Sequence, residues 1–203
     1  MLTVKTFTPT DYFGSNCYLV SSKNEFAVID PSVSLETIIT TCPEAEGNIK
    51  YIFLTHAHFD HMIGINTFSE CKATVCIGYN DRISLSDPYK NCFLGFLGVH
   101  DGYYGNYLEL HNGDKLVLGN ETLEVIETPG HTPGGVSYYS DGMVFVGDTL
   151  FEKGGYGRCD LPGGNIDTLE HSLIKLFARF RDEIIYSGHG APSTFAETIN
   201  YFN

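Results

Sequence analysis

The chain has 203 residues, of which 42% are apolar and 18% are charged, and its formal net charge is −13 at pH 7. This length suits one domain with a sizeable core, so we expect residues 1–203 to form a single domain. The negative charge argues against nucleic acid and against an anionic membrane surface as binding partners.

Short apolar runs rich in β-branched residues and bounded by turn residues predict strands along the whole chain. In chain order these runs are 17–20, 26–29, 51–55, 73–77, 115–118, 122–126, 136–139, 143–146 and 184–186. Apolar residues three or four apart predict helices over 35–41, 62–68, 167–180 and 195–201, of which 167–180 has the clearest pattern. Many strands with a few interspersed helices indicate a mixed α/β fold.

The segment 87–107 has no clean period, although it is rich in aromatic residues and glycine, as in the runs FLGFLG at 93–98 and GYYG at 102–105. One interpretation is a long connection whose aromatic side chains cover the sheet edge. The other is an apolar wall beside an active site, or a contact surface between subunits.

The N-terminal residues lack the basic start and apolar run of a signal peptide, and no apolar stretch approaches the ~20 residues of a membrane-spanning helix. The six cysteines are scattered without any C-x-x-C pair. This pattern is typical of reduced thiols rather than of a disulfide framework, so we expect a cytoplasmic protein.

Four side chains of the types that bind metals occur within six positions at the end of the predicted strand 51–55. They are His56, His58, Asp60 and His61, in the run T-H-A-H-F-D-H. Alternate residues of an extended segment point the same way, so His56 and His58 can converge on one metal ion. Asp60 and His61 lie where the chain turns into a helix, so they can face a second ion. A solvated polar loop would not require this density of ligand types.

Further ligand-type residues follow predicted strands downstream: His131 in T-P-G-H-T-P-G, Asp148 in G-D-T and His189 in G-H-G. Each is flanked by glycine or proline, which let the backbone bend sharply and present the side chain. Four separate strand ends that each carry ligand types predict one shared metal site. The remaining histidines fall outside these motifs and are interpreted as surface or packing residues: His100, His111 and His171.

The motifs T-H-x-H-x-D-H, T-P-G-H-T-P-G, G-D-T and G-H-G, in this order, resemble those of the metallo-β-lactamase superfamily. Within it the sequence is most similar to glyoxalase II-like hydrolases (hydroxyacylglutathione hydrolases), in the short form that lacks an added C-terminal helical domain. The resemblance spans about residues 16–193 and includes GYGRCDLPGG at 155–164, which is similar to the G-x-G-R-x-D-x-P-x-G stretch of that form. It implies an αββα sandwich of four layers with metals at one edge.

The resemblance also implies a role for each ligand. The first of two divalent metal ions would be bound by His56, His58 and His131. The second would be bound by Asp60, His61 and His189, and Asp148 would bridge both. Because these ligands offer only nitrogen and oxygen, zinc is the expected metal, and iron or manganese would also be accepted.

Two metals would lower the pKa of a bound water and hold the resulting hydroxide for attack on a substrate carbonyl. Asp60 would orient that hydroxide as well as bind metal, which makes it the expected catalytic residue. A thiol with a pKa near ~8.5 leaves with little protonation, whereas an amine needs a proton donor that the motifs do not clearly supply. We therefore expect hydrolysis of a thioester, such as S-lactoylglutathione or a related acyl-thiol.

Arg158 is the expected substrate-binding residue, because a guanidinium can hold a carboxylate through two hydrogen bonds. The partner would then be a small anionic acyl-thiol. A structural ion pair between Arg158 and Asp160 is an equal alternative. Glyoxalase II enzymes also use a tyrosine just after the last motif, where this chain has Gly-Ala-Pro at 190–192, so glutathione recognition stays open.

Other functions also remain open. A persulfide dioxygenase of the same fold would use His56, His131 and Asp148 around a single iron, a set that leaves positions for oxygen. A lactonase or β-lactamase would use the same hydrolytic site on another substrate. A metal-binding module without turnover is the last alternative, and the complete ligand set argues against it.

Overall fold

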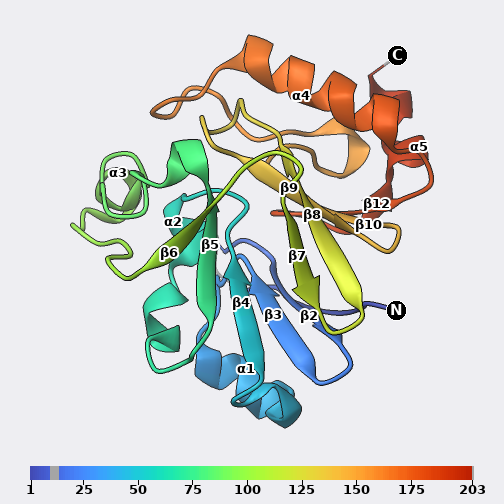
Figure 1. Ribbon diagram of the computed structural model, residues 1–203. Coiled ribbons are helices and arrows are strands. Elements are labelled where there is room, and N and C mark those ends of the chain that lie inside the picture. The colour runs from blue at the N-terminus through green and yellow to red at the C-terminus, as the bar shows by residue number, and fades with distance from the viewer. Residues whose placement is uncertain (10–13, 203) are drawn as a thin grey trace.

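The computed structural model describes residues 1–9 and 14–202 (Figure 1). Its described strands form two six-stranded sheets. The first sheet has the order β1 (Thr3–Phe7), β2 (Cys17–Ser22), β3 (Glu25–Ile29), β4 (Ile49–Phe53), β5 (Thr74–Gly78) and β6 (Tyr107–Leu110). The second has the order β12 (Ser193–Thr194), β11 (Ile184–Ser187), β10 (Met143–Gly147), β9 (Val136–Ser140), β8 (Glu121–Glu127) and β7 (Lys115–Leu118).

The helices lie outside the two sheets (Figure 1). They are α1 (Leu35–Thr41), α2 (Phe59–Met62), α3 (Phe93–Leu97), α4 (Ile166–Arg179) and α5 (Phe195–Thr198), with short 3-10 turns between other elements. The longest, α4, starts at Asn165, whose side chain accepts a hydrogen bond from the backbone N–H of Thr168. Such a cap satisfies one of the N–H groups that a helix start leaves without a partner. No described helix has the length and apolar character needed to cross a bilayer.

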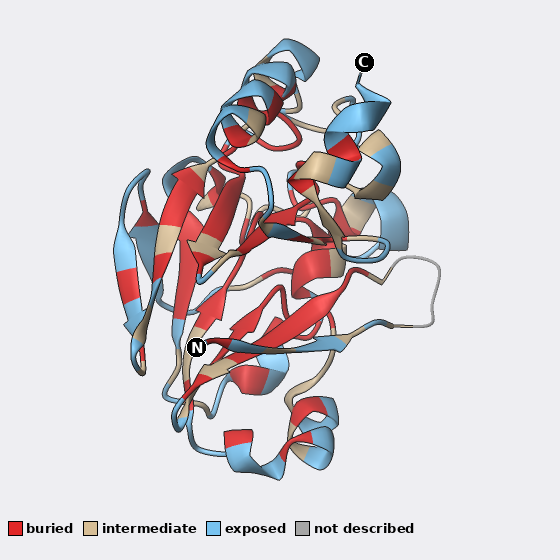
Figure 2. Cartoon of the chain, turned by 90° about the vertical axis from the view of Figure 1, so that its right-hand side faces the viewer, coloured by how far each residue is buried: buried red, intermediate tan, exposed pale blue. Residues whose placement is uncertain are grey.

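Alternating side chains of the strands build three apolar cores, and these define four layers. In β2, Cys17 and Leu19 pack toward α1 and α2, whereas Tyr18 and Val20 pack between the sheets. In β10, Phe145 faces the space between the sheets, while alternate valines of the strand pack against α4. Buried residues accordingly concentrate in the strands of both sheets (Figure 2). The predicted αββα sandwich is confirmed.

The predicted helix over 62–68 is wrong in its bounds. The α-helix is α2, Phe59–Met62, and a 3-10 turn follows at Ile65–Phe68. Between them, the N–H of Gly64 donates to the carbonyl of Pro31, and a Cβ on Gly64 would lie 2.2 Å from the carbonyl oxygen of Val33. The backbone packs so closely against the loop after β3 that the helix does not continue there.

Two edge strands of the first sheet, β1 and β6, were not predicted from the sequence. Lys5 interrupts the first of these strands and Glu109 the second, so neither has an uninterrupted apolar run, and most of their residues are exposed or only partly buried. The segment 87–107 also contains the short helix α3, which starts after Cys92 and ends at Gly98, both with positive φ. A helix of five residues has too few turns to produce a recognisable period.

The strands that carry the predicted ligands end at one edge of the sandwich. In the first sheet, β3, β4, β5 and β6 are parallel neighbours. In the second sheet, β10 and β11 are parallel, and β8 shares their direction because both β8 and β10 pair antiparallel with β9. The loops that follow these strands therefore meet where the two sheets face each other.

Candidate metal centre

The structure brings together all seven residues that the sequence predicts as metal ligands. They come from four segments: His56 and His58 in the loop after β4 with Asp60 and His61 on α2, His131 between β8 and β9, Asp148 after β10 and His189 after β11. The three other histidines are exposed and lie outside this cluster: His100, His111 and His171.

One group of possible ligand atoms belongs to His56, His58 and His131, whose ring nitrogens lie within 4.8 Å of one another. His58 Nδ1 is 2.8 Å from His131 Nε2. The His56 ring meets both other rings nearly at right angles, with centroids 4.7 and 4.8 Å away. Three imidazoles that converge in this way form a cluster suited to one metal ion.

A second group contains Asp60, His61 and His189. Asp60 Oδ2 lies 3.2 Å from His189 Nε2 and 3.6 Å from His61 Nε2. Asp148 lies between the two groups, because its Oδ1 is 3.2 Å from His61 Nε2 and its Oδ2 is 3.5 Å from His131 Nε2. The carboxylate of Asp148 is thus in position to contact ions on both sides.

The side chains of the cluster are suited to hold a divalent cation. Nε2 of His56, of His58 and of His61 is buried and makes no hydrogen bond to any described residue. Burying a polar atom without a partner is costly, and a metal ion is one of the few groups that would satisfy several such nitrogens at once. A donor set of imidazole and carboxylate groups binds zinc, iron or manganese.

Burial and neighbouring charges set the protonation of the cluster. Burial lowers the pKa of His58 to about 3 and that of His56 well below its usual value. Burial by itself would raise the pKa of Asp148, but the charge and hydrogen bond of His61 together with the charges of His131 and His189 outweigh it, and the pKa is lowered. Burial would lower the pKa of His61, but the carboxylates of Asp60 and Asp148 raise it well above its usual value. Neutral imidazole and ionised carboxylate are the forms that coordinate metals, so His56, His58 and Asp148 are ready to bind a cation, whereas His61 releases its proton when it does so.

Asp30 supports the cluster from the end of β3, and sequence analysis missed it. It is buried at φ 52°, and its Oδ1 and Oδ2 accept hydrogen bonds from the N–H and the hydroxyl of Thr55. Its Oδ2 also lies 2.9 Å from His61 Nδ1, which directs His61 Nε2 toward the other ligands. Asp30 directly follows a predicted strand, the same signal that singled out Asp148, but no glycine or histidine motif surrounds it.

Asn16 holds the loop that carries His189. The Asn16 side chain donates hydrogen bonds to the carbonyls of Ser187, at 3.1 Å, and Gly190, at 3.0 Å, and its backbone N–H donates to Gly188. A Cβ on Gly188 would lie 2.1 Å from Asp148 Oδ1. This loop therefore approaches the cluster so closely that only glycine fits beside His189.

A second buried carboxylate, Asp81, joins two ligand-bearing loops. Its Oδ2 accepts a hydrogen bond from the hydroxyl of Thr132 at 2.7 Å, and its Oδ1 accepts one from the N–H of Gly134 at 2.6 Å. The N–H of Ala57 points at the same Oδ2 from 3.4 Å. Burial raises the pKa of Asp81, while the hydrogen bonds from Thr132 and Gly134 oppose that shift. Asp81 thus connects the loop around His131 to the residue between His56 and His58.

We expect Asp81→Ala to weaken metal binding about tenfold, the lower end of the range for residues that support metal ligands. The substitution removes the acceptor shared by the two loops, so the three imidazoles lose their fixed spacing. Affinity is measured by competition with a chromophoric chelator, and Asp182→Ala, an exposed aspartate before β11, is the control. An unchanged affinity in Asp81→Ala would show that the loops keep their spacing without this carboxylate.

Five of the seven predicted ligands line a cavity of about 260 Å³: His58, Asp60, His131, Asp148 and His189. Arg158 lines this cavity, and it forms the ion pair with Asp160 that sequence analysis left as an alternative. Nε and Nη2 of Arg158 donate to the two carboxylate oxygens of Asp160, each at 2.6 Å. This pair raises the pKa of Arg158 and lowers that of Asp160 to about 2. The backbone carbonyl of Arg158 accepts a hydrogen bond from His131 Nδ1 at 2.7 Å, so Arg158 also orients a predicted ligand.

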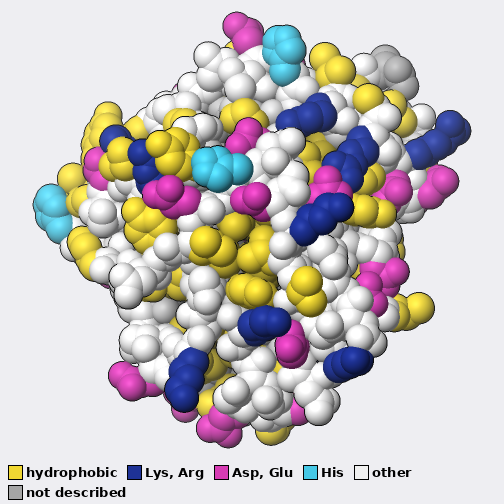
Figure 3. Space-filling model, viewed as in Figure 1, with side chains coloured by type: hydrophobic (Ala, Val, Ile, Leu, Met, Phe, Trp, Pro, Cys, Tyr) yellow, Lys and Arg dark blue, Asp and Glu magenta, His cyan; other side chains and the backbone are white. Residues whose placement is uncertain are grey.

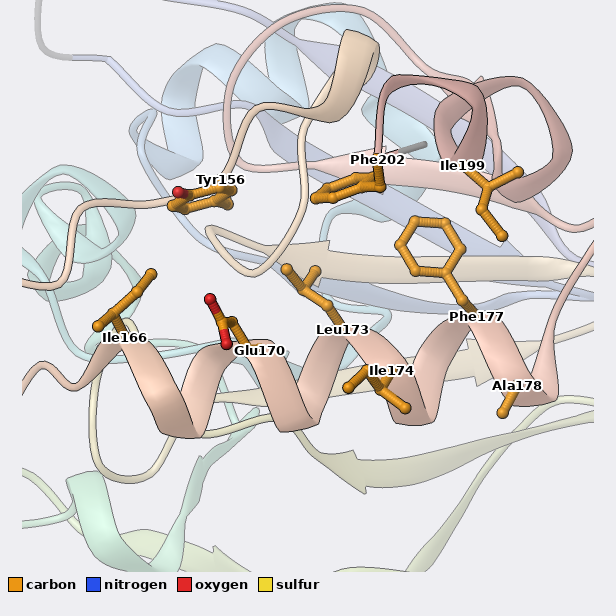
Figure 4. Close-up of a pocket in the computed structure, with 9 residues that line it drawn as sticks. All are labelled: Tyr156, Ile166, Glu170, Leu173, Ile174, Phe177, Ala178, Ile199 and Phe202. Atoms are coloured by element: carbon orange, nitrogen blue, oxygen red, sulfur yellow. The ribbon is translucent and has the colours of Figure 1, made fainter.

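A larger groove of about 600 Å³ runs along α4 and has different chemistry (Figure 4). Tyr156 and Phe202 face Leu173 and Phe177 across it (Figure 4). Its lining contains one carboxylate, Glu170, and none of the predicted ligands. The groove therefore lacks the groups that catalysis would require, and the smaller cavity is the candidate active site.

Comparison with known proteins agrees with this geometry. Residues 10–189 match the family model described as the Metallo-beta-lactamase superfamily. Hydroxyacylglutathione hydrolase GloC of Haemophilus influenzae is 31% identical over 93% of this chain and 92% of its own length. The crystal structure of BLEG-1 B3 metallo-beta-lactamase superposes with a TM-score of 0.87 at 30% identity, covering 98% of this chain and 97% of that one. The structure of TTHA1623 in a di-iron-bound form gives a TM-score of 0.84 at 27% identity, covering 98% of each chain.

The sandwich, the ligand cluster at its edge and the family match define the class of protein: the chain belongs to the metallo-β-lactamase superfamily. Members of this superfamily are mostly hydrolases that use divalent metals, often zinc. Within it the chain is similar to the glyoxalase II-like hydrolases, at about the 31% identity of the Haemophilus enzyme.

Proposed function

We propose that this chain is a thioester hydrolase that uses two divalent metal ions, with zinc as the expected metal. The observation that carries the proposal is the position of Asp148, which lies between two groups of ligand atoms rather than beside one. In the proposal, the first ion is held by His56, His58 and His131, the second by Asp60, His61 and His189, and Asp148 contacts both. The name of the related Haemophilus enzyme, a hydroxyacylglutathione hydrolase, supports the choice of a thioester.

The bound metals would supply an activated water and polarise the substrate carbonyl. Asp60 lines the cavity, and its backbone carbonyl accepts a hydrogen bond from the hydroxyl of Ser15 at 3.0 Å, which fixes the start of α2. From this position the Asp60 carboxylate can accept a hydrogen bond from the attacking water and so direct the lone pair of that water toward the carbonyl. We therefore assign Asp60 the catalytic role of orienting the nucleophile.

The leaving group argues for a thioester rather than an amide. Among the described residues that line the cavity, the carboxylates are Asp60 and Asp148, and both belong to the ligand set. A leaving amine needs a proton from an acid in the site, whereas a thiol with a pKa near ~8.5 departs as thiolate. A small acyl-thiol therefore matches the groups of this cavity better than a lactam does.

The proposal is tested by metal analysis combined with a substrate screen. Protein reconstituted with zinc should contain close to two metals per chain and should cleave S-lactoylglutathione or a simple acyl-thiol faster than lactones or β-lactams. One iron per chain with oxygen uptake on glutathione persulfide would instead indicate a dioxygenase. Faster cleavage of a β-lactam than of any thioester would overturn the choice of substrate.

A further inference from the structure

The segment 87–107 is fixed to the loop that carries the predicted ligands. The N–H of Phe59, the residue between His58 and Asp60, donates a hydrogen bond to the carbonyl of Asn91 at 2.8 Å. Asn91 is fully buried, and its side chain accepts from the N–H of Phe93 and donates to the carbonyl of Asp101. Hydrogen bonds through Asn91 therefore fix the position of this segment relative to the predicted ligands.

Aromatic side chains extend from this anchor over the cavity. The ring of Phe96, on α3, stacks on Phe59 with centroids 5.3 Å apart and an angle of 24° between the planes. Phe93 meets the same Phe59 ring at its edge, with centroids 5.9 Å apart. Phe96 is 38% exposed, and it lines the cavity. A large apolar surface is thus available to whatever occupies the site.

We define the apolar wall as the cavity-lining residues Phe59, Cys92, Phe96 and Leu161. None of these side chains is charged at neutral pH, and burial raises the pKa of the Cys92 thiol to about 11. Hydrophobic side chains also gather on the side of the molecule where α3 lies (Figure 3). The apolar interpretation of the segment 87–107 is therefore the one that the cavity supports.

Arg158 is the one lysine or arginine among the described residues that line the cavity, and it offers little to an anionic substrate. Both of its donors described above face Asp160, which is itself exposed. A substrate carboxylate that approaches Arg158 would have to displace or lie beside the Asp160 carboxylate. An exposed ion pair contributes only ~0–1 kcal/mol, so the pair can open, but the repulsion by Asp160 offsets the gain. Away from the predicted ligands, the cavity wall thus offers an uncharged substrate group more than a carboxylate.

We propose that the apolar wall binds the part of the substrate that adjoins the reacting thioester, and that this part is uncharged and apolar. This inference rests on the proposed function and narrows its substrate class to acyl-thiols that carry no charge on the atoms next to the thioester. The cavity of about 260 Å³ lies below the roughly 300–1,000 Å³ of pockets that enclose a whole ligand of drug size. It therefore receives the reacting end of the substrate, and the remainder extends outward.

The test compares two thiols of similar length as ligands of the metal-loaded protein: butanethiol, which is uncharged, and 3-mercaptopropionate, which is anionic. The thiolate stays near the metals, and the remaining atoms lie along the apolar wall. Butanethiol should bind about tenfold more tightly, the effect of burying two methylene groups. In Phe96→Ala the difference should fall to about twofold, and Phe96→Leu, which keeps apolar volume, should restore most of it.

Tyr89→Ala is the matched control, because Tyr89 is an exposed aromatic residue of the same segment and does not line the cavity. It should leave both affinities unchanged. Equal affinities of the two thiols in the wild-type protein, or a preference that survives in Phe96→Ala, would overturn the proposal. Thioester hydrolysis is measured on the same preparation. If thioesters are not cleaved while the thiol preference depends on Phe96, the proposed function is wrong, but the binding of an uncharged group by the apolar wall is supported.

Discussion

His56→Ala and His131→Ala are each expected to lose metal and nearly all turnover. His56 is a predicted ligand that belongs both to the group with His58 and His131 and to a group with His61 and Asp148. Its ring centroid lies 4.1 Å from that of His61. Removing either imidazole opens the first group, and the remaining nitrogens no longer surround an ion.

The measurement is elemental analysis together with thioester hydrolysis after reconstitution with zinc. His171→Ala is the matched control, because His171 is an exposed histidine on α4 and should leave both values unchanged. Circular dichroism and the melting temperature establish that each variant is folded. Two metals per chain with normal activity in either ligand variant would show that the ligand assignment is wrong.

Asp60→Asn is expected to keep much of the metal and to lose turnover by roughly a hundredfold or more, the scale expected for a misplaced reacting group. Asparagine has nearly the same size and can still offer one oxygen near His189, which lies 3.2 Å from the Asp60 carboxylate. Its amide nitrogen donates a hydrogen bond instead of accepting one, so the attacking water loses its orientation. The loss should appear in kcat rather than in KM.

Asp148→Asn separates this catalytic role from a role in metal binding. Because Asp148 lies between the two groups of predicted ligands, replacing its carboxylate with the amide of asparagine should lower the metal content as well as the rate. Near-normal turnover in Asp60→Asn would show that Asp60 only supports its loop. Loss of metal in Asp60→Asn equal to that in Asp148→Asn would also contradict a separate role in orienting water.

The predicted ligands could be found from the sequence because each lies in a short motif at a strand end. His131 and His189, for example, lie in short runs of glycine or proline residues that predict a sharp turn. The residues that hold those loops could not be found in this way. Asp30, Asp81 and Asn16 act through hydrogen bonds to residues far away in the chain, and no local pattern marks the partner.

The sequence by itself determined the class of fold, the helix α4 and the set of ligand-type residues, because apolar periodicity and turn residues act over a few positions. Only the tertiary structure showed that Arg158 pairs with Asp160, because that pairing depends on the course of a loop. It also decided that the helix near Met62 stops before Gly64, where another loop packs against the backbone. The tertiary structure also places Phe96 of the segment 87–107 in the cavity wall, through the contacts of Asn91 and Phe59. These features depend on contacts between distant segments, and such contacts leave no period in the sequence.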